Sequence, residues 1–131
     1  MADLSANLAG ITLRNPVVAA AGTCGYVDEL ADCLAPRELG AIVTKSITRS
    51  PREGNAPWRI IDLPGGMLNA IGLANVGLDR FLSEKLPAAD RLDTVLVGSI
   101  AGNSVEDYLA IAEAFDAQPK LPVVDLNVSC P

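Results

Sequence analysis

One stretch of the sequence decides the fold class: residues 94–128, TVLVGSIAGNSVEDYLAIAEAFDAQPKLPVVDLNV. Its apolar ends, residues 94–100 and 123–128, are predicted to be buried strands, because they are short and rich in Val, Leu and Ile. Between them Ser104 and Asp107 resemble a capping box, which begins a helix. The residues expected on the apolar face of that helix are Val105, Tyr108, Leu109, Ala112 and Phe115. A strand–helix–strand order predicts parallel strands joined by a right-handed crossover.

The same alternation extends toward the N-terminus. Residues 16–21 and 41–44 are predicted to be two further buried strands. Residues 4–13 predict a hairpin with its turn at Ala9-Gly10. Apolar residues at helical spacing predict two more helices, one with Tyr26, Leu30, Cys33 and Leu34 and one with Leu78, Phe81, Leu82 and Leu86. The expected order is therefore a hairpin followed by βαβαβαβ, in a single domain that covers residues 1–131.

Two α/β architectures fit this order: an open doubly wound sheet, or half of an eight-stranded βα barrel. A dinucleotide-binding sheet normally has the glycine pattern GxGxxG directly after its first strand. Here residues 22–25 have the spacing GxxG, and the sequence contains no P-loop. A TIM barrel is therefore favoured. Such a barrel needs about 250 residues, so this chain would supply the first half of it.

Composition excludes several classes of function. The formal net charge is −6, with 16 acidic and 10 scattered basic residues, so the basic surface needed for nucleic-acid binding is not expected. No apolar run approaches the roughly 20 residues of a membrane span, and the first apolar stretch lacks the basic leader of a signal peptide. We therefore expect a cytoplasmic protein. Three cysteines without a CxxC spacing, and no histidine, predict no metal site. Acid–base chemistry must then use Cys, Lys, Tyr or a carboxylate.

Candidate functional residues follow the predicted parallel strands, where ligands gather in both architectures. Small residues at 20–22 and 98–99 would let a flat ligand lie against the backbone. Lys45 ends an apolar strand and is either a contact to an anionic ligand or a lysine that extends from the rim to solvent. Cys130 is either a general base or nucleophile acting as thiolate, or a small half-buried residue. Asp125 shares a strand face with Asn127 and is expected to pair with a lysine or with backbone amides.

The segment between the second strand and the second predicted long helix, residues 45–75, is rich in proline, glycine and asparagine. Loops of this length inside compact domains are usually functional. A hairpin is expected around residues 63–66. Residues 69–75, NAIGLAN, offer amides for a pyrimidine and a glycine that lets backbone N–H groups turn toward an anion. The alternative is an ordinary turn before the helix, with Asn75 as its N-cap.

Taken in order, five segments resemble the class 1 dihydroorotate dehydrogenases. They are Asn15-Pro16 followed by Ala-Ala-Gly, Thr44-Lys45-Ser46, Arg52-Glu53-Gly54-Asn55, residues 66–73 (GMLNAIGL) and residues 126–131 (LNVSCP). The NAIGL and NxSCP elements are the most specific. NAIGL is closer to the NAD-linked type, which works with an iron–sulfur flavoprotein subunit. The resemblance covers essentially all of this chain, but only the first half of that family's chain.

The resemblance implies a βα barrel in which FMN oxidises dihydroorotate to orotate in pyrimidine biosynthesis. Cys130 would be the base that removes the C5 proton, while the C6 hydride passes to the flavin. Lys45 would contact flavin and substrate and stabilise developing negative charge. The implied substrate-binding residues are Lys45, Asn69, Ala70, Ile71, Gly72, Leu73 and Asn127. The implied flavin-binding residues are Ala21, Gly22, Lys45, Ser46, Ser99 and Asn127.

The resemblance also implies an iron–sulfur, FAD-containing electron-transfer subunit as a partner, in a heterotetramer, or otherwise a homo-oligomer. Ala21 stands where the family commonly has serine, and Ser99 where it commonly has asparagine. Each difference is expected to weaken a flavin hydrogen bond by about 0.5–1.5 kcal/mol. The chain is truncated relative to the family, whose phosphate-binding loops follow strands seven and eight, so we expect it not to hold flavin tightly by itself. The alternatives are a dihydropyrimidine dehydrogenase-like flavin domain and a non-enzymatic half-barrel interaction module.

Overall fold

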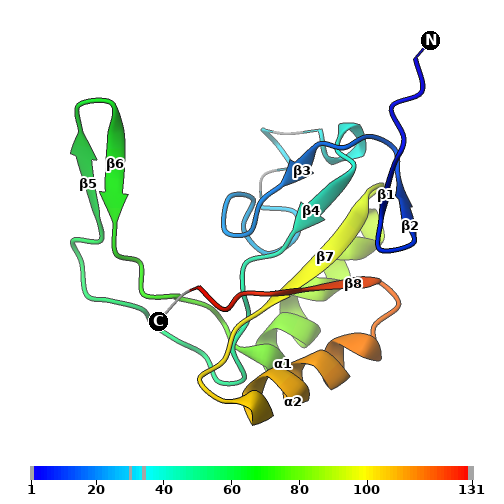
Figure 1. Ribbon diagram of the computed structural model, residues 1–131. Helices are drawn as coiled ribbons and strands as arrows, with labels where there is room; N and C mark the ends of the chain where they lie inside the picture. The colour runs from blue at the N-terminus through cyan, green and yellow to red at the C-terminus, as the bar shows by residue number, and fades with distance from the viewer. Residues whose placement is uncertain (1, 30, 34, 130–131) are drawn as a thin grey trace.

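The computed structural model describes residues 2–29, 31–33 and 35–129. Its centre is a four-stranded parallel sheet in the order β3-β4-β7-β8 (Figure 1). The strands are β3 (Val18–Ala19), β4 (Ala41–Val43), β7 (Val95–Ile100) and β8 (Val123–Leu126). Their spatial order equals their order in the chain. In a doubly wound sheet the chain starts at an inner strand and the strand order reverses there. The observed order is instead that of consecutive strands of a TIM barrel. The predicted fold, the first half of such a barrel, is confirmed.

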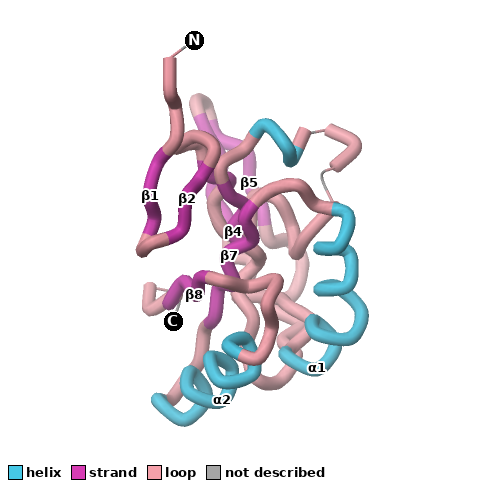
Figure 2. Tube along the Cα trace, turned by 90° about the vertical axis from the view of Figure 1, so that its right-hand side faces the viewer, coloured by secondary structure: helices cyan, strands magenta, loops and turns pink. Residues whose placement is uncertain are grey.

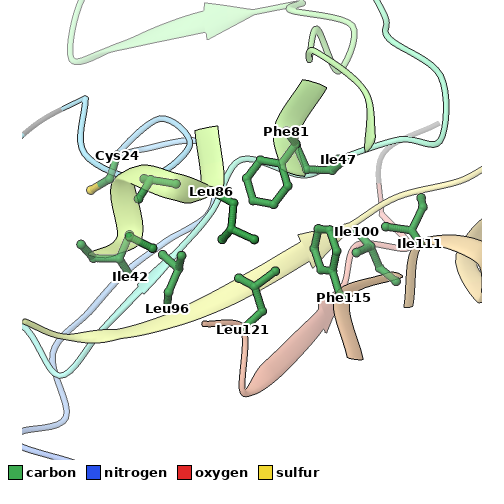
Figure 3. Close-up of a cluster of buried hydrophobic side chains, with 12 residues drawn as sticks. Cys24, Ile42, Ile47, Phe81, Leu86, Leu96, Ile100, Ile111, Phe115 and Leu121 are labelled. Carbon is green, nitrogen blue, oxygen red and sulfur yellow. The ribbon is translucent and has the colours of Figure 1, made fainter. Parts of the chain in front are cut away.

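One face of the sheet packs against helices and forms the main hydrophobic core (Figure 3). Ile42, Leu96 and Ile100 of the strands belong to one buried cluster with Phe81 and Phe115 of the helices. The two phenylalanine rings lie 5.4 Å apart between centroids. Figure 2 shows both helical segments on the same side of the strands. This face corresponds to the outer wall of a barrel, where helices cover the strands.

The opposite face of the sheet is apolar and covered at the amino ends of the strands, and polar and open at their carboxyl ends. At their amino ends, the hairpin of β1 (Ala6–Leu8) and β2 (Ile11–Leu13) covers Ala41 and Val97, with Leu13 buried between them. The predicted turn at Ala9-Gly10 is confirmed, and both residues have positive φ, 50° and 87°, as hairpin turns of the primed types require. At the carboxyl ends of the strands this face is open and carries polar side chains.

A second hairpin projects from the body of the molecule (Figure 1). It consists of β5 (Ile60–Leu63) and β6 (Gly66–Asn69), in antiparallel register with Ile60 opposite Asn69. The predicted turn is confirmed: Pro64 precedes Gly65, whose φ is 87°, the arrangement typical of a type II turn. Every residue of both strands is exposed.

The helix predicted from Tyr26 to Leu34 is not formed in the described part of that segment; residues 26–29 and 31–33 form turns and bends. The Glu29 carboxylate accepts the backbone N–H groups of Tyr26 and Val27, at 2.9 and 2.8 Å, and so closes a local turn that competes with helix formation. Burial acts to raise the pKa of Glu29, but these hydrogen bonds and one from Lys85 outweigh it and lower the pKa. Cys33, expected on an inner helix face, is exposed, whereas Cys24 is buried. The short helix η1 (Pro36–Glu38) follows.

The next helical segment changes type along its length. It begins as the α-helical turn α1 (Leu78–Arg80), widens into the π-helical turn η2 (Phe81–Lys85) and ends as the 3₁₀-helix η3 (Leu86–Arg91). Pro87 lies at the start of η3. Proline has no N–H to continue an α-helical ladder and its ring clashes with the preceding turn, which explains the change. Phe81 and Leu86 are buried, as their spacing predicted.

Helix α2 (Val105–Asp116) begins at Ser104, whose hydroxyl accepts the Asp107 N–H at 3.2 Å. The predicted N-cap is therefore confirmed. The predicted apolar face is partly wrong, because Val105 and Leu109 are 69% and 55% exposed. The side that packs on the sheet contains Tyr108, Ile111, Ala112 and Phe115, whose spacing of three and four residues keeps them on one stripe. None of the described helices is long and apolar enough to cross a membrane.

Candidate functional site

A cleft of about 530 Å³ lies at the carboxyl ends of the parallel strands. The segments after β3, β4 and β8 form its floor, and the hairpin β5–β6 with the loop that follows it forms a wall. Nine residues predicted to bind substrate or cofactor line this cleft: Ala21, Gly22, Lys45, Ser46, Asn69, Ile71, Gly72, Leu73 and Asn127. The rest of the described lining consists of Thr23, Ile60 and Met67. A second depression shares Ala21 and Asn127 with the cleft and extends along residues 125–129.

Three predicted site residues are not in the described lining. Ser99 is completely buried, 0% exposed, beneath Ser46. Ala70 is held within the loop, where its N–H donates to the Arg59 carbonyl at 2.8 Å and its carbonyl accepts from Asn55 Nδ2 at 2.9 Å. Cys130 lies outside the described residues. Direct ligand contact through the buried Ser99 side chain is therefore not supported by this arrangement, whereas Ala70 is exposed and its contact with a ligand stays a prediction.

Lys45 is the only charged residue in the described lining of the cleft. Its backbone N–H donates to the Gly25 carbonyl at 2.8 Å, which ties the end of β4 to the loop after β3. The side chain is half-buried and forms no ion pair with a carboxylate of the described residues. A partly desolvated cation without a protein counter-charge favours an anionic ligand nearby.

The loop of residues 69–73 depends on close backbone packing. Gly72 has a φ of 74°, and a Cβ added there would stand 2.7 Å from the backbone nitrogen of Asn55. Both features require glycine. Asn55 donates its own N–H to the Ile71 carbonyl at 3.0 Å and its side-chain amide to the Ala70 carbonyl. The anchoring role of Asn55 was not found from the sequence, because it depends on a contact across the loop.

Asn75 ends this loop and does not have the predicted N-cap role, since the residue at the N-cap of α1 is Gly77. The Asn75 side chain is instead buried, 6% exposed. Its oxygen accepts the N–H groups of Thr48 and Gly77, and its nitrogen donates to the Leu73 carbonyl at 2.9 Å. The Asn75 side chain thus links the segment after β4, at Thr48, to Leu73 in the cleft loop and to Gly77 at the start of α1.

Four polar side chains connect the cleft floor to the sheet. Asn127 Nδ2 donates to Ser46 Oγ at 2.9 Å, Ser46 Oγ lies 2.8 Å from Ser99 Oγ, and Ser99 Oγ donates to Asp125 Oδ2 at 2.8 Å. We refer to Asn127, Ser46, Ser99 and Asp125 as the hydrogen-bond chain. Asp125 therefore pairs with a hydroxyl, and the predicted lysine or backbone partner is wrong. Tyr108 fixes the same end of β8, because its hydroxyl donates to the Asn127 carbonyl at 2.6 Å.

Gly98 has a different role from the one predicted. A flat ligand was expected to lie against it, but a Cβ added at Gly98 would stand 2.5 Å from Cδ2 of Phe115. Gly98 therefore faces the helix side of the sheet, and the absence of a side chain lets the ring of α2 approach the strand. The small residues that do line the cleft are those after β3, Ala21 and Gly22.

The arrangement suits a planar, polar ring with an anionic group. Ala21 and Gly22 offer a surface without bulk, Ser46 and Asn127 offer hydrogen bonds, and Lys45 offers a positive charge. The hairpin side chains Ile60 and Met67 provide apolar contact on one wall. Apolar walls with a few convergent polar groups are the usual composition of sites for small ligands.

Comparisons with known proteins show which family the chain resembles. The family model for dihydroorotate dehydrogenase matches residues 3–131. The chain is 47% identical over 129 residues to the catalytic subunit of dihydroorotate dehydrogenase B (NAD(+)) from Geotalea daltonii. The aligned region covers 98% of this chain and 42% of that protein. It is 44% identical over 131 residues to the protein of the same name from Bacillus caldolyticus, which covers 100% of this chain and 42% of that protein.

Among solved structures, the fold resembles that of DHODH from Eimeria tenella, crystallised in complex with ferulenol. The TM-score is 0.70 at 26% sequence identity, and the match covers 95% of this chain and 36% of that one. The chain thus spans about 42% of the length of the sequence relatives named above. Because the family model matches nearly the whole chain, the chain belongs to the dihydroorotate dehydrogenase family.

Proposed function

We propose that this chain forms the N-terminal half of the catalytic barrel of an enzyme that oxidises dihydroorotate to orotate in pyrimidine biosynthesis, with FMN as its cofactor. The observation that carries the proposal is the cleft at the carboxyl ends of the strands, which brings nine of the predicted site residues together. Family membership supports the reaction. Family membership also favours a dihydroorotate dehydrogenase over a dihydropyrimidine dehydrogenase-like domain and over a non-enzymatic half-barrel module.

The residues present fit the ring of a flavin. A Cβ added at Gly22 would meet no atom within 4 Å, so the segment after β3 leaves open space beside the cleft. Ser46 and Asn127 offer hydrogen bonds on the floor. When bound, FMN supplies the hydride acceptor. In barrels of this type the phosphate is usually held by loops after strands seven and eight, which belong to the part of the fold beyond this half.

Lys45 and the loop of residues 69–73 would hold the substrate. The Lys45 ammonium group would lie near the substrate carboxylate and near the negative charge that develops on the ring. Asn69, and the backbone around Ile71 and Gly72, would bind the pyrimidine amides, and Asn127 would bridge substrate and flavin. The glycine at 72 lets the loop backbone approach closely, as its packing against Asn55 indicates.

Cys130 would be the base that removes the C5 proton. It lies outside the described residues, and the proposal rests on the resemblance of residues 126–131 to the family and on the preceding residues, of which Asn127 lines the cleft and Ser129 the depression beside it. A thiol has an ordinary pKa of about 8.5, and the thiolate is the reactive form. A general base with that pKa predicts a reductive half-reaction that accelerates as the pH rises toward the pKa.

The test uses the full-length flavoprotein in anaerobic stopped-flow experiments, with flavin bleaching by dihydroorotate as the signal. Cys130→Ala is expected to bind flavin normally and to slow bleaching at neutral pH by about 10²–10⁴-fold. Unchanged bleaching in that variant would remove Cys130 from the proposed role. A wild-type protein that holds flavin but is not bleached by dihydroorotate would refute the function as a whole.

Lys45→Met tests the cation. We expect a higher KM for dihydroorotate and a lower kcat, because the lost charge interacts with both the substrate carboxylate and the developing ring charge. Lys120→Met is the matched control: it also removes a lysine, but one whose ion pair with Asp90 lies on the surface. Equal effects of the two changes would argue against a role for Lys45. Activity on dihydrouracil equal to that on dihydroorotate would favour the dihydropyrimidine dehydrogenase alternative.

A partner subunit is also part of the proposal. The relatives are named catalytic subunits, a name that implies a second, electron-transfer subunit in a heteromeric assembly. We propose that this partner is an iron–sulfur, FAD-containing subunit and that the assembly is a heterotetramer. The catalytic chain alone should then reduce its flavin with dihydroorotate but fail to pass electrons to NAD⁺. Light scattering gives the stoichiometry, and rapid NAD⁺ reduction by the lone chain would contradict the proposal. The cytoplasmic location stays a prediction.

A further inference from the structure

The hydrogen bonds of the hydrogen-bond chain all run in one direction, and this direction depends on its four residues together. Its members come from three strand ends: Ser46 follows β4, Ser99 lies in β7, and Asp125 and Asn127 lie in and after β8. The register of the sheet places Ser99 directly opposite Asp125. Ser99 is 0% and Ser46 5% exposed, so the central bond of the chain is shielded from water, where hydrogen bonds are stronger and unpaired groups are costly.

The donor direction at the Asp125 end follows from chemistry. An ionised carboxylate only accepts hydrogen bonds, so the Ser99 hydroxyl must donate its single proton to Asp125 Oδ2. The Ser99 oxygen can then only accept from its neighbour, Ser46, 2.8 Å away. The Ser46 hydroxyl therefore donates its single proton to Ser99. Toward Asn127 and the cleft, the Ser46 oxygen can only accept hydrogen bonds.

The Asn127 end gives the same direction independently. The backbone N–H of Ser129 can only donate, and it points to Asn127 Oδ1 at 3.3 Å, with the Ser129 hydroxyl 3.1 Å from the same oxygen. The amide oxygen of Asn127 is therefore turned toward Ser129, and its nitrogen toward Ser46. The Asp125 end thus sets the direction of every bond, from Asn127 to Asp125, and the Asn127 end agrees with it for the first bond.

This direction determines what the cleft floor offers to a ligand. A serine hydroxyl on its own rotates and serves as donor or acceptor. In the hydrogen-bond chain the Ser46 hydroxyl is locked as an acceptor, and Asn127 has one N–H left to donate. A ligand ring then has to present an N–H group to Ser46 and an oxygen or unprotonated nitrogen to Asn127.

We propose that Ser99 and Asp125 are positioning residues that set Ser46 as the acceptor and Asn127 as the donor for the ring of FMN. They act through the two cleft residues and need no contact with the ligand, which accounts for the complete burial of Ser99. The choice of FMN as ligand rests on the proposed function. The fixed polarity of the chain rests on the hydrogen bonds alone.

The test compares Ser99→Ala, Asp125→Ala and Asp125→Asn in the full-length protein. The first readout needs no ligand: the side-chain amide signals of Asn127 in ¹⁵N-correlated NMR spectra of the apoprotein, and their rate of hydrogen exchange. The second is the Kd for FMN, from quenching of flavin fluorescence, with the visible absorption spectrum of the bound flavin. Thr44→Val is the matched control. It removes another fully buried hydroxyl, which accepts the Ser99 backbone N–H at 3.0 Å but lies outside the chain.

We expect Ser99→Ala and Asp125→Ala to shift the Asn127 amide signals, to speed their exchange and to weaken FMN binding by about tenfold, the equivalent of one hydrogen bond. Asp125→Asn keeps an oxygen that can accept from Ser99, so binding should recover to within about threefold of wild type. Thr44→Val should lower stability but leave the Asn127 signals and the flavin spectrum unchanged.

Several results would overturn the positioning role. Asn127 amide signals that stay in place in Ser99→Ala and Asp125→Ala would refute the chain itself, with or without a ligand. Equal effects of Thr44→Val would reduce Ser99 to a packing residue, and an unchanged Kd for FMN in both alanine variants would remove its effect on the ligand. If the amide signals respond as expected but the wild-type protein does not bind FMN, the proposed function fails while the polarity of the cleft floor stands.

Discussion

Gly98 lies within β7 and faces the ring of Phe115 in α2. A methyl group added at Gly98 would stand 2.5 Å from Cδ2 and 2.6 Å from Cε2 of that ring. Carbon atoms in ordinary contact are about 3.5–4.0 Å apart, so the ring would have to retreat by about 1 Å. Phe115 is completely buried and already packs on Phe81, so the retreat would displace a second ring.

We therefore expect Gly98→Ala to lower the free energy of unfolding by about 1–3 kcal/mol, the usual cost of overpacking a core. The same change should lower the Tm of the full-length protein. Urea and thermal denaturation followed by circular dichroism measure both quantities. Gly66→Ala is the control, because a Cβ there meets no atom within 4 Å, and we expect its stability to stay within about 0.5 kcal/mol of wild type.

A double-mutant cycle identifies the cause. Phe115→Leu is destabilising by itself, because it removes buried ring surface, but it also makes room for the methyl group at position 98. The combined variant should be more stable than the sum of the two single effects predicts, by about 1 kcal/mol or more. Effects that add to within about 0.5 kcal/mol, or a Gly98→Ala variant as stable as wild type, would refute the packing argument.

Three further changes test other parts of the fold by the same denaturation assays. Gly40→Ala should cost about 3 kcal/mol or more, because its Cβ would collide with the backbone oxygen of Asn15; a small loss would contradict this. Tyr108→Phe removes the hydrogen bond to the Asn127 carbonyl and should cost about 1 kcal/mol; an unchanged stability would show that bond to be dispensable. Glu29→Gln should cost about 1 kcal/mol at neutral pH, because the carboxylate accepts the backbone N–H groups of Tyr26 and Val27. The folded pKa of Glu29 lies below its ordinary value of 4.5, so this difference should be full above that value and vanish as the pH falls through the folded pKa; a difference that persists in acid would refute it.

Local patterns were sufficient for β4, β7, β8 and the hairpins, whereas the buried strand predicted at residues 16–21 is limited to β3, with Val17 and Val18 57% and 40% exposed. The apolar runs that became β4, β7 and β8 were found because a buried parallel strand requires a short continuous run of β-branched and aliphatic residues. The turns at Ala9-Gly10 and Pro64-Gly65 were found because only a few residue types adopt positive φ easily. These signals depend on backbone sterics within four or five residues, and the rest of the molecule rarely overrides them.

Contacts between distant segments were not predictable in the same way. The Glu29 carboxylate replaced a predicted helix by a turn, through hydrogen bonds that helical spacing does not reveal. Gly98 was assigned to the ligand side of the sheet, because small residues at strand ends suit both a ligand and a closely packed ring. The anchoring roles of Asn55 and Asn75 depend on which carbonyl groups the fold brings beside them. In each case the sequence offered a residue type with two uses, and tertiary packing selected one.

The location of the cleft was predictable because it follows from strand direction alone, whereas its chemistry depends on register. Along the inner face, β7 and β8 pair Val97 with Val123 and then Ser99 with Asp125. The face thus changes from apolar to polar within one pleat, at the point where cover by the N-terminal hairpin ends. A slip of one residue in β8 would turn the Asp125 carboxylate toward the helix side and the core around Ile100 and Phe115. The cost of burying that charge is large. The same apolar pattern that selects the register therefore places Ser99 opposite Asp125 and, through them, fixes the hydrogen-bonding groups that the cleft presents.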